Sequence, residues 1–242
     1  HTRGAVVKSR LWGMGRPHLW AGRRFHGNIA FESQQRFDQW FDDYRRWMLH
    51  YARLAQAQGV ELLCIGNELA GLTGRSAAWR SLVADVRRVY RGPLTYAAHW
   101  ESELESIDFW DVLDYIGVNY YFPIAAAGER PSSDSPEIAD AARRIERVRA
   151  RFGKPVLFTE VGFPALATAA SRPWEENGSR LDPDLQSACY RIWMEAFAMR
   201  PRVFGIFWWK WPSDGSSSPF DGSHRPLGKP AMGVLTDWFS RL

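Results

Sequence analysis

Apolar and polar residues follow two different periods along this chain. In residues 37–55, apolar side chains recur every three or four positions with charged residues between them, which predicts an amphipathic helix. Gly59 follows as a C-terminal helix glycine. Residues 60–67 then form a nearly continuous apolar run, which is typical of a strand buried on both faces of a sheet.

The same pair of patterns repeats to the end of the chain. Further helices are predicted at 76–90, 137–152, 184–199 and 231–242, with a short helical turn at 108–113. Further strands are predicted at 6–12, 94–100, 115–121, 155–160 and 203–209. Strands that alternate with helices predict an α/β fold with a parallel sheet, here as a single domain over residues 1–242. The longer, aromatic-rich loops follow the strands, as in a (β/α)8 TIM barrel, although six β/α units do not close eight strands.

Two of the predicted strands end on a glutamate. Glu68 follows Gly66 and Asn67, and Glu160 stands two residues before Gly162. Because the carboxyl ends of parallel strands carry the active site of such barrels, the two carboxylates are expected to face one cleft. A pair separated by ~5–5.5 Å hydrolyses glycosides with retention, one residue acting as nucleophile and the other as acid and then base. Taken alone, Glu68 fits a helix N-cap or a surface acid equally well.

Aromatic residues are unusually frequent, with thirteen Trp among 242 residues. Tryptophan packs well in a core, but its flat face also stacks on the apolar face of a sugar ring. The candidates near strand ends or in the long loop 163–182 are Trp12, His99, Trp100, Asn119 and Trp174. Each fits a sugar contact and a packing role equally well. Glu101, Glu103 and Glu105 are expected to form a solvated turn, with Glu101 at the rim of the cleft.

Charge and spacing exclude several other classes of function. The formal net charge of +4 comes without a dense Lys/Arg block, which argues against nucleic-acid binding. No run of 18 apolar residues predicts a membrane span. The two cysteines fall inside a strand and a helix, and the six histidines lack metal-ligand spacing, so neither a disulfide framework nor a metal or other cofactor is expected. We expect a monomer, and favour secretion or the periplasm over the cytoplasm.

Four segments carry a resemblance to a known family. They are 64–69 (CIGNEL), 114–123 (DYIGVNYYFP), 153–163 (GKPVLFTEVGF) and 204–211 (FGIFWWKW). Together they resemble glycoside hydrolase family 113, a group of retaining β-mannanase-like barrels. The resemblance implies that Glu68 is the acid/base and Glu160 the nucleophile. It also implies that Tyr121 hydrogen-bonds the nucleophile and that Trp208 or Trp209 floors the cleavage subsite.

The chain departs from the family pattern at three places. The first two β/α units of the barrel have no counterpart, so the chain corresponds to the third to eighth units. The family's Lys-Pro-His pattern on the third strand reads Lys8-Ser9-Arg10, which leaves Lys8 as a substrate-binding candidate. Many members have Asp where this chain has Asn119.

The function expected from these observations is an endo-β-1,4-mannanase that binds a β-mannan or related β-glycan and works by double displacement. Asn67 is expected to hydrogen-bond a sugar hydroxyl, or else to be a turn residue at the strand end. Two alternatives stay open: a retaining hydrolase of another β-glycan or oligosaccharide, and a non-catalytic carbohydrate-binding remnant of the barrel.

Overall fold

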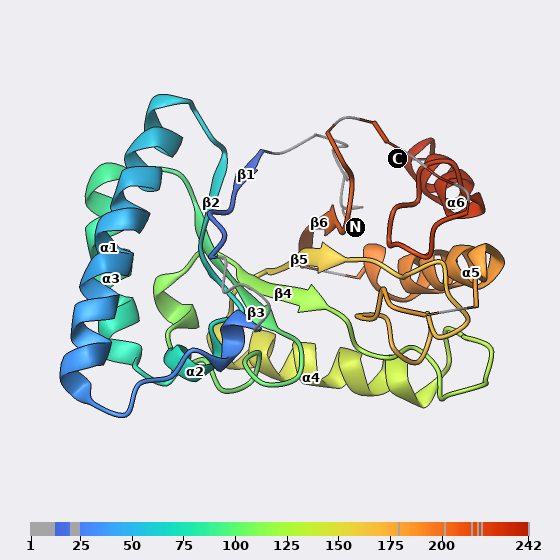
Figure 1. The fold of residues 1–242 in the computed structure, drawn as a ribbon, viewed down its shortest axis with the longest axis horizontal. Helices are drawn as coiled ribbons and strands as arrows, with labels where there is room; N and C mark the ends of the chain where they lie inside the picture. Colours follow the sequence, from blue (N-terminus) through green and yellow to red (C-terminus); the bar gives the residue numbers. More distant parts are fainter. Residues whose placement is uncertain are drawn as a thin grey trace, which may run out of the picture.

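A curled sheet of six parallel strands forms the centre of the protein, and its strands lie side by side in chain order (Figure 1). The computed structural model describes residues 13–19, 25–178, 180–200, 202–213, 215–216, 218 and 220–241. The strands are β1 (Met14–Gly15), β2 (Leu62–Asn67), β3 (Leu94–His99), β4 (Ile116–Tyr120), β5 (Val156–Val161) and β6 (Val203–Trp208). The α/β fold with a parallel sheet is thus confirmed. The described strands give the curvature of a barrel but leave it open between β1 and β6, and the strand predicted at 6–12 lies outside the described residues.

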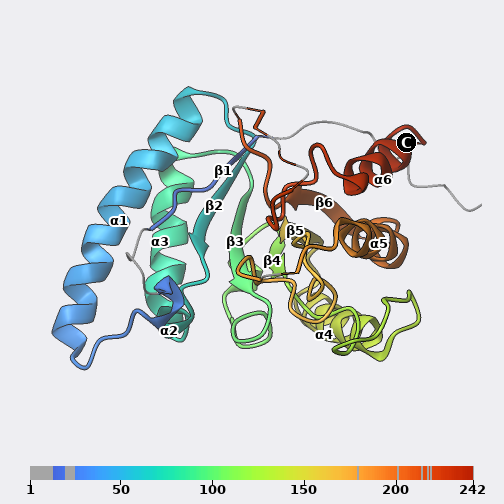
Figure 2. The ribbon, with the colours of Figure 1, turned by 45° about the vertical axis from the view of Figure 1, so that its right-hand side comes forward.

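The longer helices cover the outer side of the curled sheet (Figure 2). They are α1 (Gln34–Ala57), α3 (Ser76–Val89), α4 (Pro136–Phe152), α5 (Pro183–Trp193) and α6 (Pro230–Phe239). The short helix α2 (Ala70–Thr73) follows β2 and contacts the turn at residues 26–28. Short 3-10 turns occur at His26–Asn28 and Trp110–Val112. Helix α1 packs against α3, and α5 packs against α6. The helix predicted at 184–199 is in fact α5 followed by a π-helical turn, Met194–Ala198.

The sequence sets the helix ends through local hydrogen bonds. The Ser135 hydroxyl accepts from the Ile138 amide at the start of α4, and Pro136 occupies the first turn, where its missing N–H is not needed. Helix α4 ends at Gly153, whose φ of 68° is the left-handed conformation that glycine adopts without strain. Asp182 caps α5 by accepting from the Leu185 amide at 2.8 Å.

The core lies between the sheet and these helices and is rich in aromatic side chains. Trp79 on α3 and Trp193 on α5 are fully buried. Cys64 and Cys189 are buried and unpaired. Among the described residues, no helix has the length and apolar character needed to cross a membrane. The same residues contain no cluster of three or more His, Cys, Asp or Glu arranged to hold a metal ion.

Irregularities in strand pairing occur near the carboxyl end of the sheet. The register between β2 and β3 shifts between Cys64 and Asn67. Between β4 and β5, Val118 pairs with Phe158 whereas Asn119 pairs with Glu160, so β5 has one extra residue, Thr159. A β-bulge of this kind bends the strand and re-aims its side chains. The shift in β2 precedes Glu68, and the bulge in β5 directly precedes Glu160.

Candidate active site

A cleft of about 770 Å³ opens at the carboxyl ends of the strands. It contains both predicted catalytic glutamates together with aromatic, imidazole and amide side chains. The residues that line it are His18, Phe25, His26, Asn67, Glu68, His99, Trp100, Glu101, Tyr121, Glu160, Trp174, Glu176, Asn177, Trp209 and His224. The prediction that Glu68 and Glu160 face one cleft therefore agrees with the structure.

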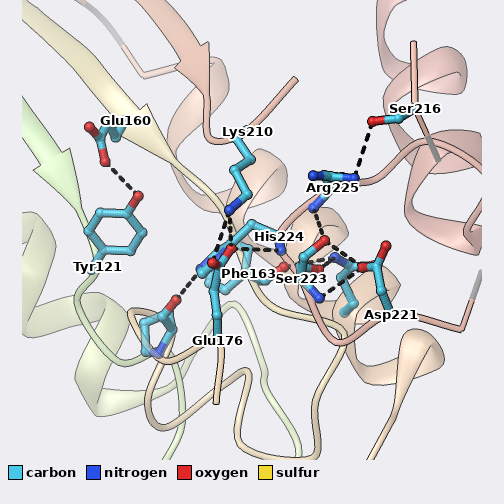
Figure 3. Close-up of polar contacts among 12 residues, drawn as sticks. Tyr121, Glu160, Phe163, Glu176, Lys210, Ser216, Asp221, Ser223, His224 and Arg225 are labelled. Atoms are coloured by element: carbon cyan, nitrogen blue, oxygen red, sulfur yellow. Dashed lines mark hydrogen bonds and ion pairs between the residues drawn. The ribbon is translucent and has the colours of Figure 1, made fainter. Parts of the chain in front are cut away.

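Glu160, in β5, is surrounded by hydrogen-bond donors. The Tyr121 hydroxyl, just after β4, donates to Glu160 Oε2 at 2.6 Å (Figure 3). Arg16, after β1, places Nη1 2.5 Å from Glu160 Oε1. Burial alone would lower the pKa of Arg16, but the adjacent Glu160 carboxylate raises it, so the guanidinium stays charged. Each oxygen of Glu160 thus has a donor, which suits the ionised carboxylate.

Glu68 has a different environment, with one amide donor and no Lys or Arg in contact among the described residues, while His26 Nε2 lies 3.9 Å from its Oε2. Asn119 donates to Glu68 Oε1 at 2.9 Å. Burial, together with the negative charge of Glu160, raises the pKa of Glu68 to about 7. Near neutral pH this carboxyl therefore holds a proton much more readily than an exposed glutamate. The two carboxyl groups are suited to opposite roles, one charged and one able to give up a proton.

The backbone at Glu68 is strained. Its φ of 49° lies in the left-handed region, which costs about 1–2 kcal/mol for a residue with a side chain. Such strain persists only where neighbouring groups hold it, and it is common at functional sites. The Glu68 amide donates to the carbonyl of Ala97 at 2.9 Å, so one side of the strained residue is tied to β3.

Asn67 connects the two glutamates to a pair of histidines. Its Oδ1 accepts from Arg16 at 3.2 Å and from Asn119 at 3.0 Å. Its Nδ2 lies 3.2 Å from His18 Nε2 and 3.3 Å from His26 Nε2. Burial lowers the pKa of both imidazoles, so both are neutral near pH 7, and each Nε2 accepts from the amide. All hydrogen-bonding atoms of the Asn67 side chain are thus used to fix its orientation.

Asn119 lies beneath the cleft and is fully buried. Its Oδ1 accepts from the Thr159 hydroxyl at 2.8 Å, while its Nδ2 donates to Asn67 and Glu68. Neighbouring residues in a regular strand face opposite sides, yet both Thr159 and Glu160 reach the site. The extra residue in β5 explains this, because the bulge turns Thr159 toward Asn119 while Glu160 meets Tyr121 and Arg16.

One wall of the cleft is a stack of three rings. His99 stacks on Trp100 with centroids 5.7 Å apart, and Trp100 stacks on Trp174 with centroids 5.5 Å apart and planes at 25°. Trp174 comes from the loop after β5 and keeps 45% of its surface exposed. Trp209, directly after β6, also lines the cleft and lies under the Arg16 guanidinium, with its ring centroid 5.8 Å from Arg16 Cζ. Flat apolar faces beside carboxylates are what a sugar ring needs.

A polar cluster fixes the loop that carries Trp174. Glu176 accepts from Lys210 at 2.9 Å and lies 2.8 Å from His224 Nδ1 (Figure 3). Hydrogen bonding to His224, and then to Lys210, lowers the pKa of Glu176 to about 2. His224 also approaches the carbonyl of Pro173 with Nε2, at 2.6 Å. The loop after β5 is thereby tied to the segments that follow β6. His224 and Lys210 had no role predicted from the sequence.

Some predicted residues lie elsewhere. Trp208 does not line the cleft: its ring packs against Tyr190 and Trp193 of α5, because neighbouring residues of β6 alternate between the two faces of the sheet. Trp209 is therefore the one of the pair that faces the cleft. Lys8 and Trp12 lie outside the described residues.

The acidic turn after β3 is also different from the prediction. Glu101 lines the cleft at its rim, as expected. Glu103, predicted to be solvated, is instead fully buried, because its carboxylate accepts hydrogen bonds from the Tyr96 hydroxyl and the His99 amide.

Arg16, His18 and His26 are among the site residues that sequence reasoning missed. The residues after β1 read Arg16-Pro17-His18, a basic residue followed by Pro-His. This segment fits the Lys-Pro-His pattern of the third family strand better than Lys8-Ser9-Arg10 does. Alignment on the Pro-His pair would have identified Arg16 and His18. His26 belongs to an isolated 3-10 turn and carries no comparable signal.

Comparisons with known proteins agree on the family. The family model described as Glycoside Hydrolase Family 113 matches residues 13–219. A β-1,4-mannanase of this family, solved as a complex, is 25% identical, with a TM-score of 0.83 over 96% of this chain and 74% of that one. The β-mannanase of Alicyclobacillus acidocaldarius, solved with ManMIm, is 29% identical, with a TM-score of 0.76 over 90% of this chain and 68% of that one.

More distant similarities concern the fold alone. A β-glucuronidase of Ruminococcus gnavus is 17% identical, with a TM-score of 0.55 over 86% of this chain and 37% of that one. Comparison with curated protein sequences gives no significant match. Since the family model covers most of the chain, the protein belongs to glycoside hydrolase family 113.

Proposed function

We propose that this glycoside hydrolase is a retaining endo-β-1,4-mannanase in which Glu160 is the nucleophile and Glu68 the acid/base. The observation that carries the proposal is the contrast between the two carboxyl groups. Arg16 and Tyr121 donate to both oxygens of Glu160, whereas burial and the charge of Glu160 raise the pKa of Glu68 to about 7. A charged nucleophile beside a protonated acid is the state that begins a double displacement.

In the first step, a Glu160 oxygen attacks the anomeric carbon of the bound sugar. The bond from that carbon to the glycosidic oxygen breaks, and Glu68 transfers its proton to the departing oxygen. Removal of negative charge from Glu160 as the covalent bond forms lowers the pKa of Glu68, which helps the proton leave. Tyr121 and Arg16 position the attacking carboxylate, and Asn119 positions the acid.

In the second step, the roles of Glu68 and Glu160 reverse. The Glu68 carboxylate takes a proton from a water molecule, whose oxygen attacks the anomeric carbon. The bond between that carbon and Glu160 breaks, so the carboxylate is restored and the sugar leaves with its original configuration. Asn119 continues to donate to Glu68, now as an ion, which the amide hydrogen bond stabilises.

The choice of mannan rests on the relatives, two of which are described as β-1,4-mannanase and β-mannanase. The cleft supports a polysaccharide substrate because the His99–Trp100–Trp174 stack extends beside the carboxylates. An open cleft with an aromatic wall suits internal cleavage of a chain better than a closed pocket would.

The test compares Glu160→Gln and Glu68→Gln with the parent chain on β-1,4-mannan. We expect Glu160→Gln to lose turnover while still binding mannooligosaccharides, and azide to restore activity to Glu68→Gln on a substrate with an activated leaving group. Glu105→Gln is the matched control, because Glu105 pairs with Arg144 and Arg147 outside the cleft. Proton NMR of the first products then gives the anomeric configuration, and inversion would contradict the mechanism.

The alternative favoured by a specific observation is a carbohydrate-binding protein without turnover, because the described strands form an open sheet. If the parent chain binds mannooligosaccharides but releases no product from any β-glycan, this alternative is the better account. Cleavage of another β-glycan in preference to mannan would keep the mechanism and replace the substrate.

A further inference from the structure

A buried glutamate outside the cleft lies directly behind the predicted acid/base. Glu103 follows β3, is fully buried, and has no cation in contact with it in the described part of the chain. Its Oε1 accepts from the Tyr96 hydroxyl at 2.6 Å, and its Oε2 accepts from the His99 amide at 2.7 Å. Burial raises the pKa of Glu103 to about 8, so a carboxyl at this position lowers stability relative to an apolar side chain.

Tyr96 links this carboxylate to the backbone of the acid/base. The Tyr96 oxygen accepts from the amide of Leu69, the residue after Glu68, at 2.7 Å. The oxygen accepts there, and the hydroxyl donates its own hydrogen to Glu103 Oε1. The three groups therefore form a directed hydrogen-bond chain from the Leu69 N–H through the tyrosine hydroxyl to the Glu103 carboxyl group.

The Leu69 end of this hydrogen-bond chain lies next to the strained backbone of Glu68. Glu68 has a φ of 49°, and its own amide is held by the Ala97 carbonyl. The Leu69 amide belongs to the next peptide, so Tyr96 fixes the other side of the same residue. Gly66 lets the tyrosine lie this close: a Cβ at that position would lie 2.5 Å from the Tyr96 ring. The local packing is thus arranged around this contact.

We propose that Glu103 is a positioning residue that acts through Tyr96 to hold Glu68 in its left-handed conformation, with its carboxyl aimed into the cleft. This inference rests on the proposed role of Glu68 as acid/base. Glu103 touches neither substrate nor Glu68. It keeps the Tyr96 hydroxyl pointed so that its oxygen is free to accept from Leu69.

The test uses Tyr96→Phe and Glu103→Gln. Tyr96→Phe removes only the hydroxyl. Glu103→Gln keeps the volume but gives one oxygen where two donors need an acceptor. The matched control is Tyr44→Phe, because Tyr44 is also buried and its hydroxyl donates to the carbonyl of Ile65 in β2, away from Glu68. Thermal unfolding of all variants separates loss of fold from loss of positioning.

Two substrates distinguish positioning from general destabilisation. Cleavage of a mannooligosaccharide needs a proton from Glu68, whereas an aryl β-mannoside with a nitrophenolate leaving group does not. We expect kcat/KM for the oligosaccharide to fall about 10-fold or more in both test variants, while kcat/KM for the activated glycoside stays within about threefold. Tyr44→Phe is expected to change kcat/KM by the same factor for both substrates.

The outcomes separate the two proposals. Glu68→Gln, measured in the same assays, must itself lose oligosaccharide cleavage selectively, and if it does not, the acid/base assignment fails. Suppose that Glu68→Gln shows this selectivity, but Glu103→Gln and Tyr96→Phe lower kcat/KM for both substrates equally or leave both values unchanged. Positioning by Glu103 is then wrong, and the assignment of Glu68 stands. If Tyr96→Phe does not fold, Glu103→Gln alone decides.

Discussion

Replacement of Asn119 by Ala is expected to move the pH dependence of catalysis upward. Asn119 donates to Glu68 Oε1 at 2.9 Å, and this hydrogen bond stabilises the charged carboxylate and lowers its pKa. Burial and Glu160 outweigh it, so the pKa of Glu68 is still raised to about 7. Without the amide, the charged form loses its donor and the proton is held to higher pH.

The size of the shift follows from the strength of one charge-assisted hydrogen bond. Such a bond contributes about 1.5–3 kcal/mol, and a difference of about 1.4 kcal/mol corresponds to one pH unit. Water that enters the space left by the amide replaces part of the bond, so the lower end of the range applies. We expect the alkaline limb of the profile to rise by about one pH unit.

The measurement is kcat/KM against pH, because this ratio reports the acid and base of the free enzyme. The limb of the parent chain is expected near pH 7, where Glu68 loses its proton. Thr159→Val serves as the control, since it removes a contact of Asn119 but leaves the donor to Glu68, so its limb is expected not to move. A limb that stays in place or moves downward in Asn119→Ala would refute the reasoning.

Three further predictions concern other parts of the cleft. Tyr121→Phe removes a donor from Glu160 and is expected to lower kcat roughly 10- to 100-fold in steady-state assays, with an unchanged limb from Glu68. Trp174→Ala removes one ring of the aromatic wall and is expected to weaken mannooligosaccharide binding about 3- to 10-fold in calorimetry, against no effect if the loop does not touch sugar. Contacts with His224 hold the pKa of Glu176 at about 2, so they stabilise the folded state above pH 4.5. This stabilisation is lost as the pH falls toward 2. The difference in Tm between the parent and Glu176→Gln is therefore expected to shrink over that range.

The elements of the fold were predictable because local and tertiary signals agree. The apolar run of β2 and the helical spacing in α1 correspond to a strand and a helix at nearly the same residues. Sequence periodicity did not reveal the π-helical turn after α5, because a single widened turn changes the apolar spacing too little. It also cannot show how far six parallel strands curl, since that depends on the twist of the whole sheet.

The site was predictable for those residues whose placement follows from their position at the end of a parallel strand. Strand-end residues share one edge, so Glu68 and Glu160 were expected together from their positions, and the family resemblance added Tyr121. Contacts between distant segments were not visible in this way. Arg16 reaches Glu160 across the sheet, and the buried state of Glu103 depends on Tyr96, seven residues earlier on β3. A polar residue in a turn reads as solvated unless its partner is known.

A model of regular strands predicts the wrong side-chain directions at this site, and the geometry of the site depends on those directions. A regular β5 would turn Thr159 and Glu160 to opposite faces, and Asn119 would then lose either its hydroxyl partner or its pairing opposite Glu160. The extra residue in β5 permits both contacts, and a separate register shift in β2 lies just before Asn67. Each of the two glutamates thus follows an irregularity in strand pairing. Restoration of regular pairing in β5 would leave the fold's topology intact and separate Glu160 from Tyr121.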